Sequence, residues 1–307
     1  MFKNILFATT ASPSCDHAAR VAFDIAKRYE AKLTVFHVLG IPSRGFSQTV
    51  TDVRTGEQVT YDADYLDWVK EEMKNTYIRQ TQDYDGCTLE ALPGIPHTEI
   101  LRAARKMDVD LIIMGSTTRE DDEGSYSYKN FAGGTLQAVA KSARCPVLVI
   151  GRPAASFWGG FSNIVFGTDF SKSSEFAFQF ALKIAKNLDC SLHLFHAYDI
   201  SAIHSGRMMA QDDIEGNMRE ARDKMRKIYV PKMKDFNDYE IEVWEGIPYV
   251  EIVKYAREKY ADLIIMAHHT RTPTPEAVTF GSTLEQVVLR ATCPVASVNR
   301  PDKIREI

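Results

Sequence analysis

Short apolar runs alternate along the chain with stretches whose apolar residues recur at helical spacing. In the first half, the apolar runs occupy residues 3–9, 33–37, 88–91, 111–114 and 147–150. Between the first two runs, Ala18, Ala22 and Ile25 share one face of a predicted helix. The run 111–114 is continuously apolar, as is typical of a parallel strand covered on both faces. Strands and helices in strict alternation predict an α/β fold with a doubly wound, five-stranded parallel sheet.

The second half of the chain repeats this pattern. Residues 163–168 repeat residues 4–9 at an offset of 159, and residues 262–266 repeat residues 110–114 at an offset of 152. The later strands of this copy are predicted at residues 192–196, 240–244, 263–266 and 295–298. A period of about 150 residues is long enough for each copy to bury its own core. We therefore expect two domains of one fold, residues 1–150 and 161–307, joined by a linker at 151–160.

Local signals refine the expected elements. Ser12 followed by Pro13 predicts a helix N-cap and a first helical residue. A long helical pattern covers residues 65–80, and its counterpart covers residues 214–229. The drop in offset from 159 to 152 means that the first copy has extra residues before its third strand. We expect them to form a surface loop.

Composition and charge narrow the class of protein. Of the 307 residues, 45% are hydrophobic and 25% are charged, as in an ordinary globular protein. The net charge of -4 offers no basic surface for phosphates, so we expect no nucleic-acid partner. No apolar run approaches the roughly 20 residues that cross a bilayer, so we expect no membrane partner and a cytoplasmic location. The cysteines include no C-x-x-C pair, so disulfides are not expected, and Cys145 and Cys293 are predicted to be packing residues.

The carboxyl ends of the predicted strands form the edge at which a ligand would bind. In an open parallel sheet, ligands lie beyond these ends, near the point where the strand order reverses. The residues after the first, second and fourth strands should converge there with the start of the last helix. Glycines at this edge let backbone N–H groups approach an anion, and the helix N-terminus adds partial positive charge. His37 and His196, at the ends of second strands, are expected to be hydrogen-bonded core residues.

Motifs in both copies resemble the universal stress protein family. They are Asn-Ile-Leu-Phe at the start, Asp-Leu-Ile-Ile-Met-Gly, Gly-Ser-Thr-Leu-Glu-Gln-Val, and Cys-Pro-Val-Leu-Val-Ile at the close. The resemblance covers each copy from end to end, so the chain looks like a tandem member of the family. It implies the adenine nucleotide alpha-hydrolase-like fold, with strand order 3-2-1-4-5, and a role in the stress response. Family members that bind ATP carry an aspartate after strand one, two glycines after strand four, and a later Gly-Ser or Gly-Thr pair.

This nucleotide pattern is incomplete in both copies. The first copy has Thr10 in place of the aspartate and Thr118 in place of the second glycine. The second copy has the aspartate, Asp169, but Ala267 and Thr270 replace the two glycines. By resemblance, the candidate residues of the first copy are Thr10, Val38, Gly115, Gly133, Gly134 and Thr135. Those of the second copy are Asp169, Ala197, Ala267, Arg271, Gly281, Ser282 and Thr283.

The loop after the fourth strand separates the two copies by charge. In the first copy, the consecutive carboxylates at 120–123 would repel a triphosphate unless a cation intervened. In the second copy, Arg271 can pair with phosphate oxygens, beside His268 and His269. We therefore favour the second copy as the site for ATP or another adenine nucleotide. Magnesium is expected only together with ATP, and no protein metal site is expected, since the adjacent histidines have no evident third ligand.

Simpler roles remain open for the same residues. Gly281-Ser282 also fits the start of a capped helix, and Asp169 also fits a turn or cap. No nucleophile with a paired base and no carboxylate dyad identifies a catalytic residue. The sequence therefore favours a non-enzymatic regulatory protein of the stress response, in which any ATP hydrolysis would be slow and incidental.

Two alternatives stay open. The first is an interaction module in which both nucleotide pockets are degenerate and empty, acting through a protein partner that the sequence does not name. The second is a nucleotide-dependent ligase or hydrolase. The resemblance also implies that the last strands of the two domains pair within the chain as a pseudo-dimer. The long helices would then be free to form a homodimer.

Overall fold

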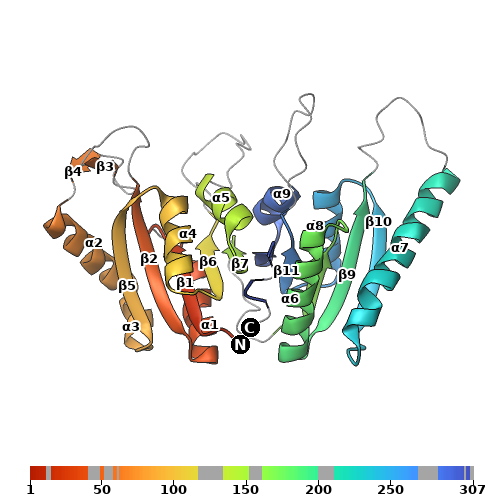
Figure 1. Cartoon of the computed structure of the whole chain (residues 1–307), viewed down its shortest axis with the longest axis horizontal. Helices are drawn as coiled ribbons and strands as arrows, with labels where there is room; N and C mark the ends of the chain where they lie inside the picture. The colour runs from red at the N-terminus through yellow and green to blue at the C-terminus, as the bar shows by residue number, and fades with distance from the viewer. Residues whose placement is uncertain are drawn as a thin grey trace. The chain divides into compact units, whose positions relative to one another are not determined.

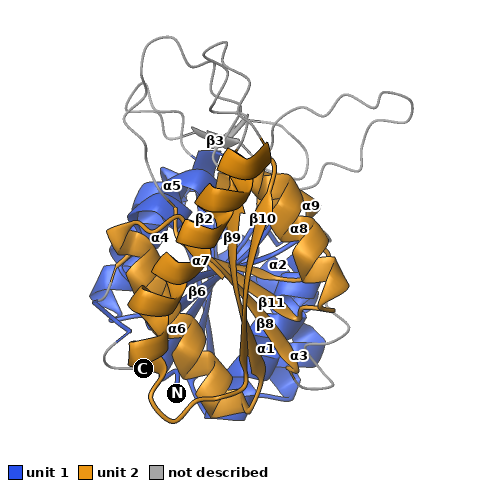
Figure 2. Ribbon diagram, turned by 90° about the vertical axis from the view of Figure 1, so that its right-hand side faces the viewer, with its two compact units in different colours: residues 1–151, 301–307 blue, residues 152–300 orange. Residues whose placement is uncertain are grey.

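The computed structural model describes residues 1–11, 15–40, 49–51, 58–60, 62–116, 134–151, 161–199, 211–268, 283–300 and 302–304. The chain divides into two compact units (Figure 2). Unit 1 comprises Met1–Gly151 and Pro301–Ile307, and unit 2 comprises Arg152–Arg300. Apart from Gly151, the predicted linker lies outside the described residues.

Unit 1 is a five-stranded parallel sheet with helices between its strands (Figure 1). Its strands are β1 (Asn4–Thr9), β2 (Lys32–Gly40), β5 (Cys87–Gly94), β6 (Leu111–Gly115) and β7 (Val147–Ile150). They lie in the order β5-β2-β1-β6-β7, and all neighbours are parallel. The helices are α1 (Asp16–Tyr29), α2 (Ala63–Thr76), α3 (Ile78–Gln82), α4 (Pro96–Lys106) and α5 (Gly134–Ser142). In chain order the sheet reads 3-2-1-4-5, which confirms the predicted fold.

Unit 2 has the same strand order. Its strands are β8 (Asn163–Gly167), β9 (Ser191–Tyr198), β10 (Tyr239–Glu245), β11 (Leu263–Met266) and β12 (Val295–Ser297). They lie in the order β10-β9-β8-β11-β12, again all parallel. The helices are α6 (Lys172–Leu188), α7 (Gln211–Met233), α8 (Pro248–Glu258) and α9 (Thr283–Arg290).

Each sheet owes its core to apolar side chains on both of its faces. In β1, Leu6 and Phe7 point to opposite faces and both have 0% exposure, so neither face is open to water. In α1, Ala18 and Ala22 are buried, and in α6, Ala177 and Ala181 repeat them. These helical stripes are core in both units, as predicted.

An aspartate before the fourth strand fixes where the first strand begins. In unit 1, Oδ2 of Asp110 accepts hydrogen bonds from the backbone N–H groups of Lys3 at 2.8 Å and Asn4 at 2.9 Å. In unit 2, Oδ2 of Asp262 accepts the same two bonds from Ser162 and Asn163, at 2.7 and 3.0 Å. Because both carboxylates are buried, these bonds satisfy a charge that would otherwise be costly in the interior.

The start of the first helix differs between the units. In unit 2, α6 begins after the N-cap Ser171, whose hydroxyl accepts the N–H of Ser174. In unit 1, α1 begins only at Asp16, after an N-cap at Cys15 that has no side-chain hydrogen bond. Ser12 and Pro13, where the sequence predicts the N-cap and the first helical residue, lie outside the described residues. In unit 2, the carboxylate of Asp169 accepts the N–H of Ser171 and fixes this turn. Unit 1 has Thr10 at the position of Asp169 and therefore lacks this carboxylate.

The segment between the second and third strands also departs from expectation. In unit 1, β3 (Thr49–Thr51) and β4 (Gln58–Thr60) form a two-stranded antiparallel sheet where the sequence predicts a surface loop. The long helical pattern of unit 1 is divided at Tyr77 into α2 and α3, whereas α7 of unit 2 continues to Met233.

Candidate functional site

The register of the strands brings the predicted residues of unit 1 to one edge. Thr9 lies opposite His37 in the β1–β2 pair, and Ala8 lies opposite Met114 in the β1–β6 pair. Thr10, Val38 and Gly115 each directly follow one of these paired residues, so they lie side by side at the carboxyl edge of the sheet. At the same edge, Gly134 is the first residue of α5 and Thr135 the second. Gly133 lies outside the described residues.

Unit 2 presents the matching edge. Gly167 lies opposite Phe195 in the β8–β9 pair and opposite Met266 in the β8–β11 pair. Asp169 and Ala267 therefore follow the ends of β8 and β11, and Ala197 lies near the carboxyl end of β9, between them and β10. Thr283 begins α9. The predicted residues Arg271, Gly281 and Ser282 lie outside the described residues.

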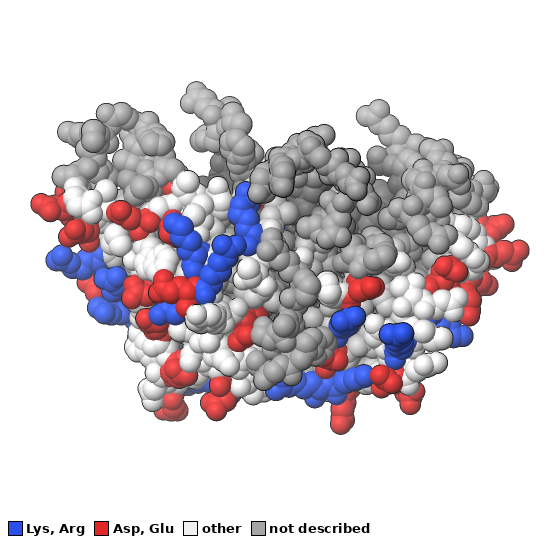
Figure 3. Space-filling model, turned by 180° about the vertical axis from the view of Figure 1, so that it is seen from behind, with Lys and Arg blue, Asp and Glu red and all other residues white. Residues whose placement is uncertain are grey.

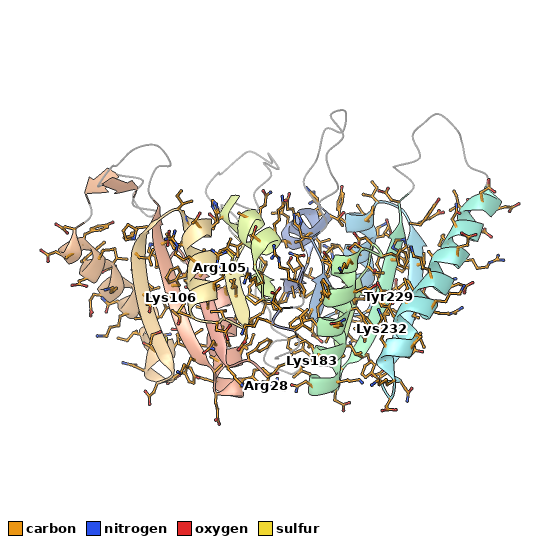
Figure 4. The ribbon with its side chains drawn as sticks, in the orientation of Figure 1. Arg28, Arg105, Lys106, Lys183, Tyr229 and Lys232 are labelled. Atoms are coloured by element: carbon orange, nitrogen blue, oxygen red, sulfur yellow. The ribbon has the colours of Figure 1, made fainter. Side chains whose placement is uncertain are left out.

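In each unit, a buried pair of hydroxyl groups lies at the end of the first strand, next to this edge. The hydroxyls of Thr9 and Tyr77 lie 2.5 Å apart in unit 1, and those of Thr168 and Tyr229 lie 2.6 Å apart in unit 2 (Figure 4 labels Tyr229 on α7). Both tyrosines have 0% exposure. Burial raises the pKa of Tyr229 to about 12 and raises the pKa of Tyr77 as well, so both hydroxyls stay protonated at neutral pH.

This hydroxyl pair is not among the features predicted from the sequence. The signal for it is present, because the tyrosines recur at the offset of 152 and the threonines at the offset of 159. The sequence does not show, however, that the repeated threonine and the repeated tyrosine lie in contact in the folded chain.

The same threonines shape the turn that follows the first strand. The hydroxyl of Thr9 accepts the N–H of Ala11 at 2.9 Å, and that of Thr168 accepts the N–H of Phe170 at 3.0 Å. Ala11 and Phe170 both adopt left-handed backbone angles, with φ of 54° and 62°. This conformation is uncommon for a side chain as large as phenylalanine, and it recurs at the same position of both units.

A histidine at the end of the second strand holds the same turn from the other side. Nδ1 of His37 lies 2.8 Å from the backbone oxygen of Thr9, and Nδ1 of His196 lies 2.8 Å from that of Thr168. A carbonyl oxygen only accepts, so Nδ1 carries the proton in both rings. Burial lowers the pKa of His196, which keeps the ring neutral at pH 7. Both histidines are hydrogen-bonded as predicted, and His37 is buried in the core, whereas His196 is only partly buried.

Asp169 of unit 2 is fixed by the first turn of α6. Its Oδ1 accepts the backbone N–H of Ser171 at 3.0 Å and the hydroxyl of Ser174. The turn-and-cap role that the sequence left open is therefore real. At the corresponding place in unit 1, Thr10 pairs with the thiol of Cys15 across 3.3 Å. The carboxylate is thus specific to unit 2.

Unit 2 also carries a cation over an aromatic pair at this edge. The ring of Phe170 lies 4.5 Å from the ring of His196, and Nζ of Lys224 lies 4.2 Å from the centre of the Phe170 ring. Lys224 comes from α7, five positions before Tyr229. The same position of α2 in unit 1 is Glu72, five positions before Tyr77. The two edges therefore share a backbone but differ in charge.

A cavity of about 270 Å³ lies at the opposite edge of unit 1, where β6 and β7 begin. Arg105 and Arg144 line it, next to the C-terminal ends of α4 and α5. Carbonyl groups at helix C-termini carry partial negative charge, and the two arginines compensate it. This cavity is therefore separate from the carboxyl edge that the sequence predicts as the ligand site.

Other features of the described residues bear on the earlier expectations. No group of three His, Cys, Asp or Glu side chains among them is placed to hold a metal ion. Within the same residues, no helix is both long and apolar enough to cross a bilayer. Burial raises the pKa of Cys145 and of Cys293 to about 12, which fits packing thiols. Figure 3 shows acidic and basic side chains interspersed over the face that it presents.

Comparison with known proteins gives the same picture. The model of the universal stress protein family matches residues 1–151 and again residues 160–299. A universal stress protein of Methanocaldococcus jannaschii is 32% identical over 147 residues, which cover 47% of this chain and 85% of that protein. A second one from the same organism is 29% identical over 161 residues, covering 46% of this chain and 96% of that protein.

Solved structures match the whole chain. A universal stress protein from Archaeoglobus fulgidus aligns over 97% of both chains with a TM-score of 0.67 and 20% identity, which shows a shared fold. A functionally unknown protein from Pseudomonas aeruginosa aligns over 99% of this chain and 95% of its own, with a TM-score of 0.57 and 17% identity. With one family match on each half and the same strand order in both units, the chain belongs to the universal stress protein family, of which it is a tandem member.

Proposed function

We propose that the chain is a non-enzymatic regulatory protein of the stress response that binds ATP or another adenine nucleotide at the carboxyl edge of unit 2. The observation that carries the proposal is the charge difference between two edges of matching backbone. Unit 2 has Asp169 and Lys224 where unit 1 has Thr10 and Glu72.

Each group suits one part of a nucleotide. Asp169 is an exposed carboxylate directly after β8, at the place where the family's nucleotide-binding members have the aspartate that meets adenine. Lys224 is an exposed cation beside it, and a cation attracts phosphate oxygens. Arg271 would add a bidentate partner for phosphate from the loop after β11. Magnesium would bind with ATP and offset its charge.

A second candidate function, the interaction module, has an observation of its own in its favour. Oδ1 of Asp169 already accepts two hydrogen bonds within the chain, and the Phe170 ring already packs against the ring of His196 in a tilted arrangement. An edge whose groups satisfy one another needs no ligand to be stable. In this alternative both edges stay empty and a protein partner binds elsewhere.

Isothermal titration of the full chain with ATP, ADP and AMP distinguishes these functions. A matched pair of variants locates the site: Gly281→Val in unit 2 and Gly133→Val at the aligned position of unit 1. A branched side chain would occupy the space in which phosphate meets the backbone. We expect Gly281→Val to weaken binding at least about tenfold, the effect of about 1.4 kcal/mol, and Gly133→Val to leave it unchanged.

The other outcomes are equally definite. A loss confined to Gly133→Val would move the nucleotide to unit 1. No heat from any nucleotide, together with no nucleotide mass in native mass spectrometry of the freshly purified protein, would favour the interaction module. Phosphate release at a rate well above that of protein-free ATP would favour the enzyme alternative. The cytoplasmic location, the pseudo-dimer and the homodimer stay predictions.

A further inference from the structure

Lys303 is a buried lysine in a part of the chain that follows unit 2 in sequence but belongs to unit 1. Its exposure is 9%, and that of the next residue, Ile304, is 3%. A lysine is seldom buried unless its ammonium group is paired, because an unpaired charge in the interior is costly. The partners of Lys303 therefore show what this segment binds.

Lys303 forms ion pairs with two aspartates just before β6. Its Nζ lies 2.6 Å from Oδ1 of Asp108 and 3.7 Å from Oδ1 of Asp110. Asp110 is the buried carboxylate whose other oxygen accepts the backbone N–H groups of Lys3 and Asn4. The side chain of Asp110, just before β6, thus contacts both the start of β1 and the distant segment that contains Lys303.

Unit 2 provides an internal comparison. Asp262 holds the start of β8 by the same two backbone hydrogen bonds. Among the residues described, however, no lysine or arginine pairs with Asp262. Within the described residues, the lysine of unit 1 is therefore an addition to the two backbone hydrogen bonds that both units share.

The segment also borders a partly apolar cavity. Asp302 and Lys303 line the cavity at the amino edge of unit 1 together with Ala104, Val109 and Cys145. Ile304 adds a side chain that is almost fully withdrawn from water, and burial of an aliphatic side chain stabilises the segment in its place. An ion pair and an apolar contact in adjacent residues make a compact docking element.

We propose that residues 302–304 form a clasp on unit 1, in which Lys303 binds Asp108 and Asp110 while burial of Ile304 keeps the segment in place. The docking site on unit 1 is the surface around Asp108 and Asp110, and the segment that binds it is residues 302–304 of the same chain. Seating the clasp slows local opening of the starts of β1 and β6. Unit 2 opens at a rate that does not depend on it.

Hydrogen–deuterium exchange of the full chain tests the clasp. Lys303→Glu places a third carboxylate beside Asp108 and Asp110, and Ile304→Asp removes the apolar contact. Each is expected to speed exchange of peptides covering residues 1–9 and 108–116 on the order of tenfold, without changing peptides covering 161–168 and 260–268. The matched controls, Lys106→Glu and Ile78→Asp, change exposed residues of unit 1 in the same way (Figure 4 labels Lys106).

The clasp is overturned if Lys303→Glu and Ile304→Asp exchange no faster than their controls. It is also overturned if they speed exchange equally in both units, because that would indicate a general loss of stability. A charge-restoring pair, Lys303→Glu with Asp108→Lys, should recover part of the protection if the ion pair seats the segment. No recovery at all would argue against the ion pair as its cause.

Discussion

Thr168 and Tyr229 bring their hydroxyl oxygens to 2.6 Å inside unit 2, although 61 positions separate them in the sequence. The bond ties the end of β8 to the long helix α7, and its counterpart ties β1 to the end of α2 in unit 1. The hydroxyl of Thr168 also accepts the N–H of Phe170 and so holds the turn that contains Asp169. One side chain therefore contacts both α7 and the backbone of the candidate site.

Replacing Tyr229 with phenylalanine removes this bond but keeps the ring against Phe166 and Phe178. We expect the free energy of unfolding to fall by about 1 kcal/mol, the usual net value of a buried hydrogen bond. Urea unfolding measures the change. Tyr260→Phe is the control, because Tyr260 is 85% exposed. Equal losses in the two variants would mean that the buried hydroxyl pair contributes nothing.

Gly167 makes room for a neighbour at the end of β8. A Cβ atom at this position would collide with Cδ1 of Ile252, a core side chain with 3% exposure. We expect Gly167→Ala to lower the free energy of unfolding by about 1–3 kcal/mol, the cost of overpacking a core. Ile252→Val removes the colliding methyl group, so the double variant should be more stable than the two single losses predict. Strict additivity in thermal unfolding would contradict this account.

Two histidines of unit 2 predict how its stability depends on pH. Burial lowers the pKa of His193 and of His196, despite hydrogen bonds from His193 to Glu240 and from His196 to Thr168 that act in the opposite direction. Glu240, Lys259 and Asp238 are the charged groups that affect His193. As the pH falls through about 6.5, the unfolded histidines bind protons before the folded ones do, so the stability present at pH 7 is progressively lost.

His193→Thr tests this dependence, since Thr34 occupies the same position in unit 1. The slope of unfolding free energy between pH 7 and pH 5.5 should become smaller in the variant. An unchanged slope would show that His193 titrates alike in the folded and the unfolded chain. The lowered pKa of Glu240, due first to its hydrogen bond from Lys259, adds a further loss only near and below about pH 4.5.

If unit 2 binds a nucleotide, Lys224 should distinguish ATP from adenosine. Lys224→Glu is expected to weaken ATP binding about tenfold, which corresponds to about 1.4 kcal/mol of binding free energy. Adenosine binding should stay nearly unchanged, because adenosine has no phosphate. Calorimetry at two salt concentrations checks the cause, because an electrostatic contribution weakens as salt screens it. The control is Glu72→Lys at the matching position of unit 1. An equal loss for ATP and adenosine would place Lys224 away from the phosphates.

The fold was predictable because its information is local or repeated. Short apolar runs define strands, helical stripes such as Ala18 and Ala22 define the covering helices, and the family resemblance supplies the strand order. The division of the long helical pattern of unit 1 at Tyr77 was not predictable, because the pattern continues through it from residue 65 to residue 80. The β3–β4 hairpin also escaped, since its strands are only three residues long.

The candidate site was predictable only in outline. Strand ends identify the edge, and the register of β8 with β9 and β11 then sets Asp169 beside Ala197 and Ala267. The contacts of Phe170 and Lys224 depend on how α7 lies across the sheet, which periodicity does not specify. Lys303 is the extreme case, because its partners Asp108 and Asp110 are almost two hundred positions away.

The same two interactions hold the turn after the first strand in both units. The threonine hydroxyl accepts the N–H of the central residue and the histidine binds the threonine's backbone carbonyl, so neither interaction uses the central side chain. Alanine in one half and phenylalanine in the other leave the same backbone. Evolution can therefore change the size of this side chain in one unit alone. Such a change alters the carboxyl edge of that unit and leaves the backbone of the turn the same in both.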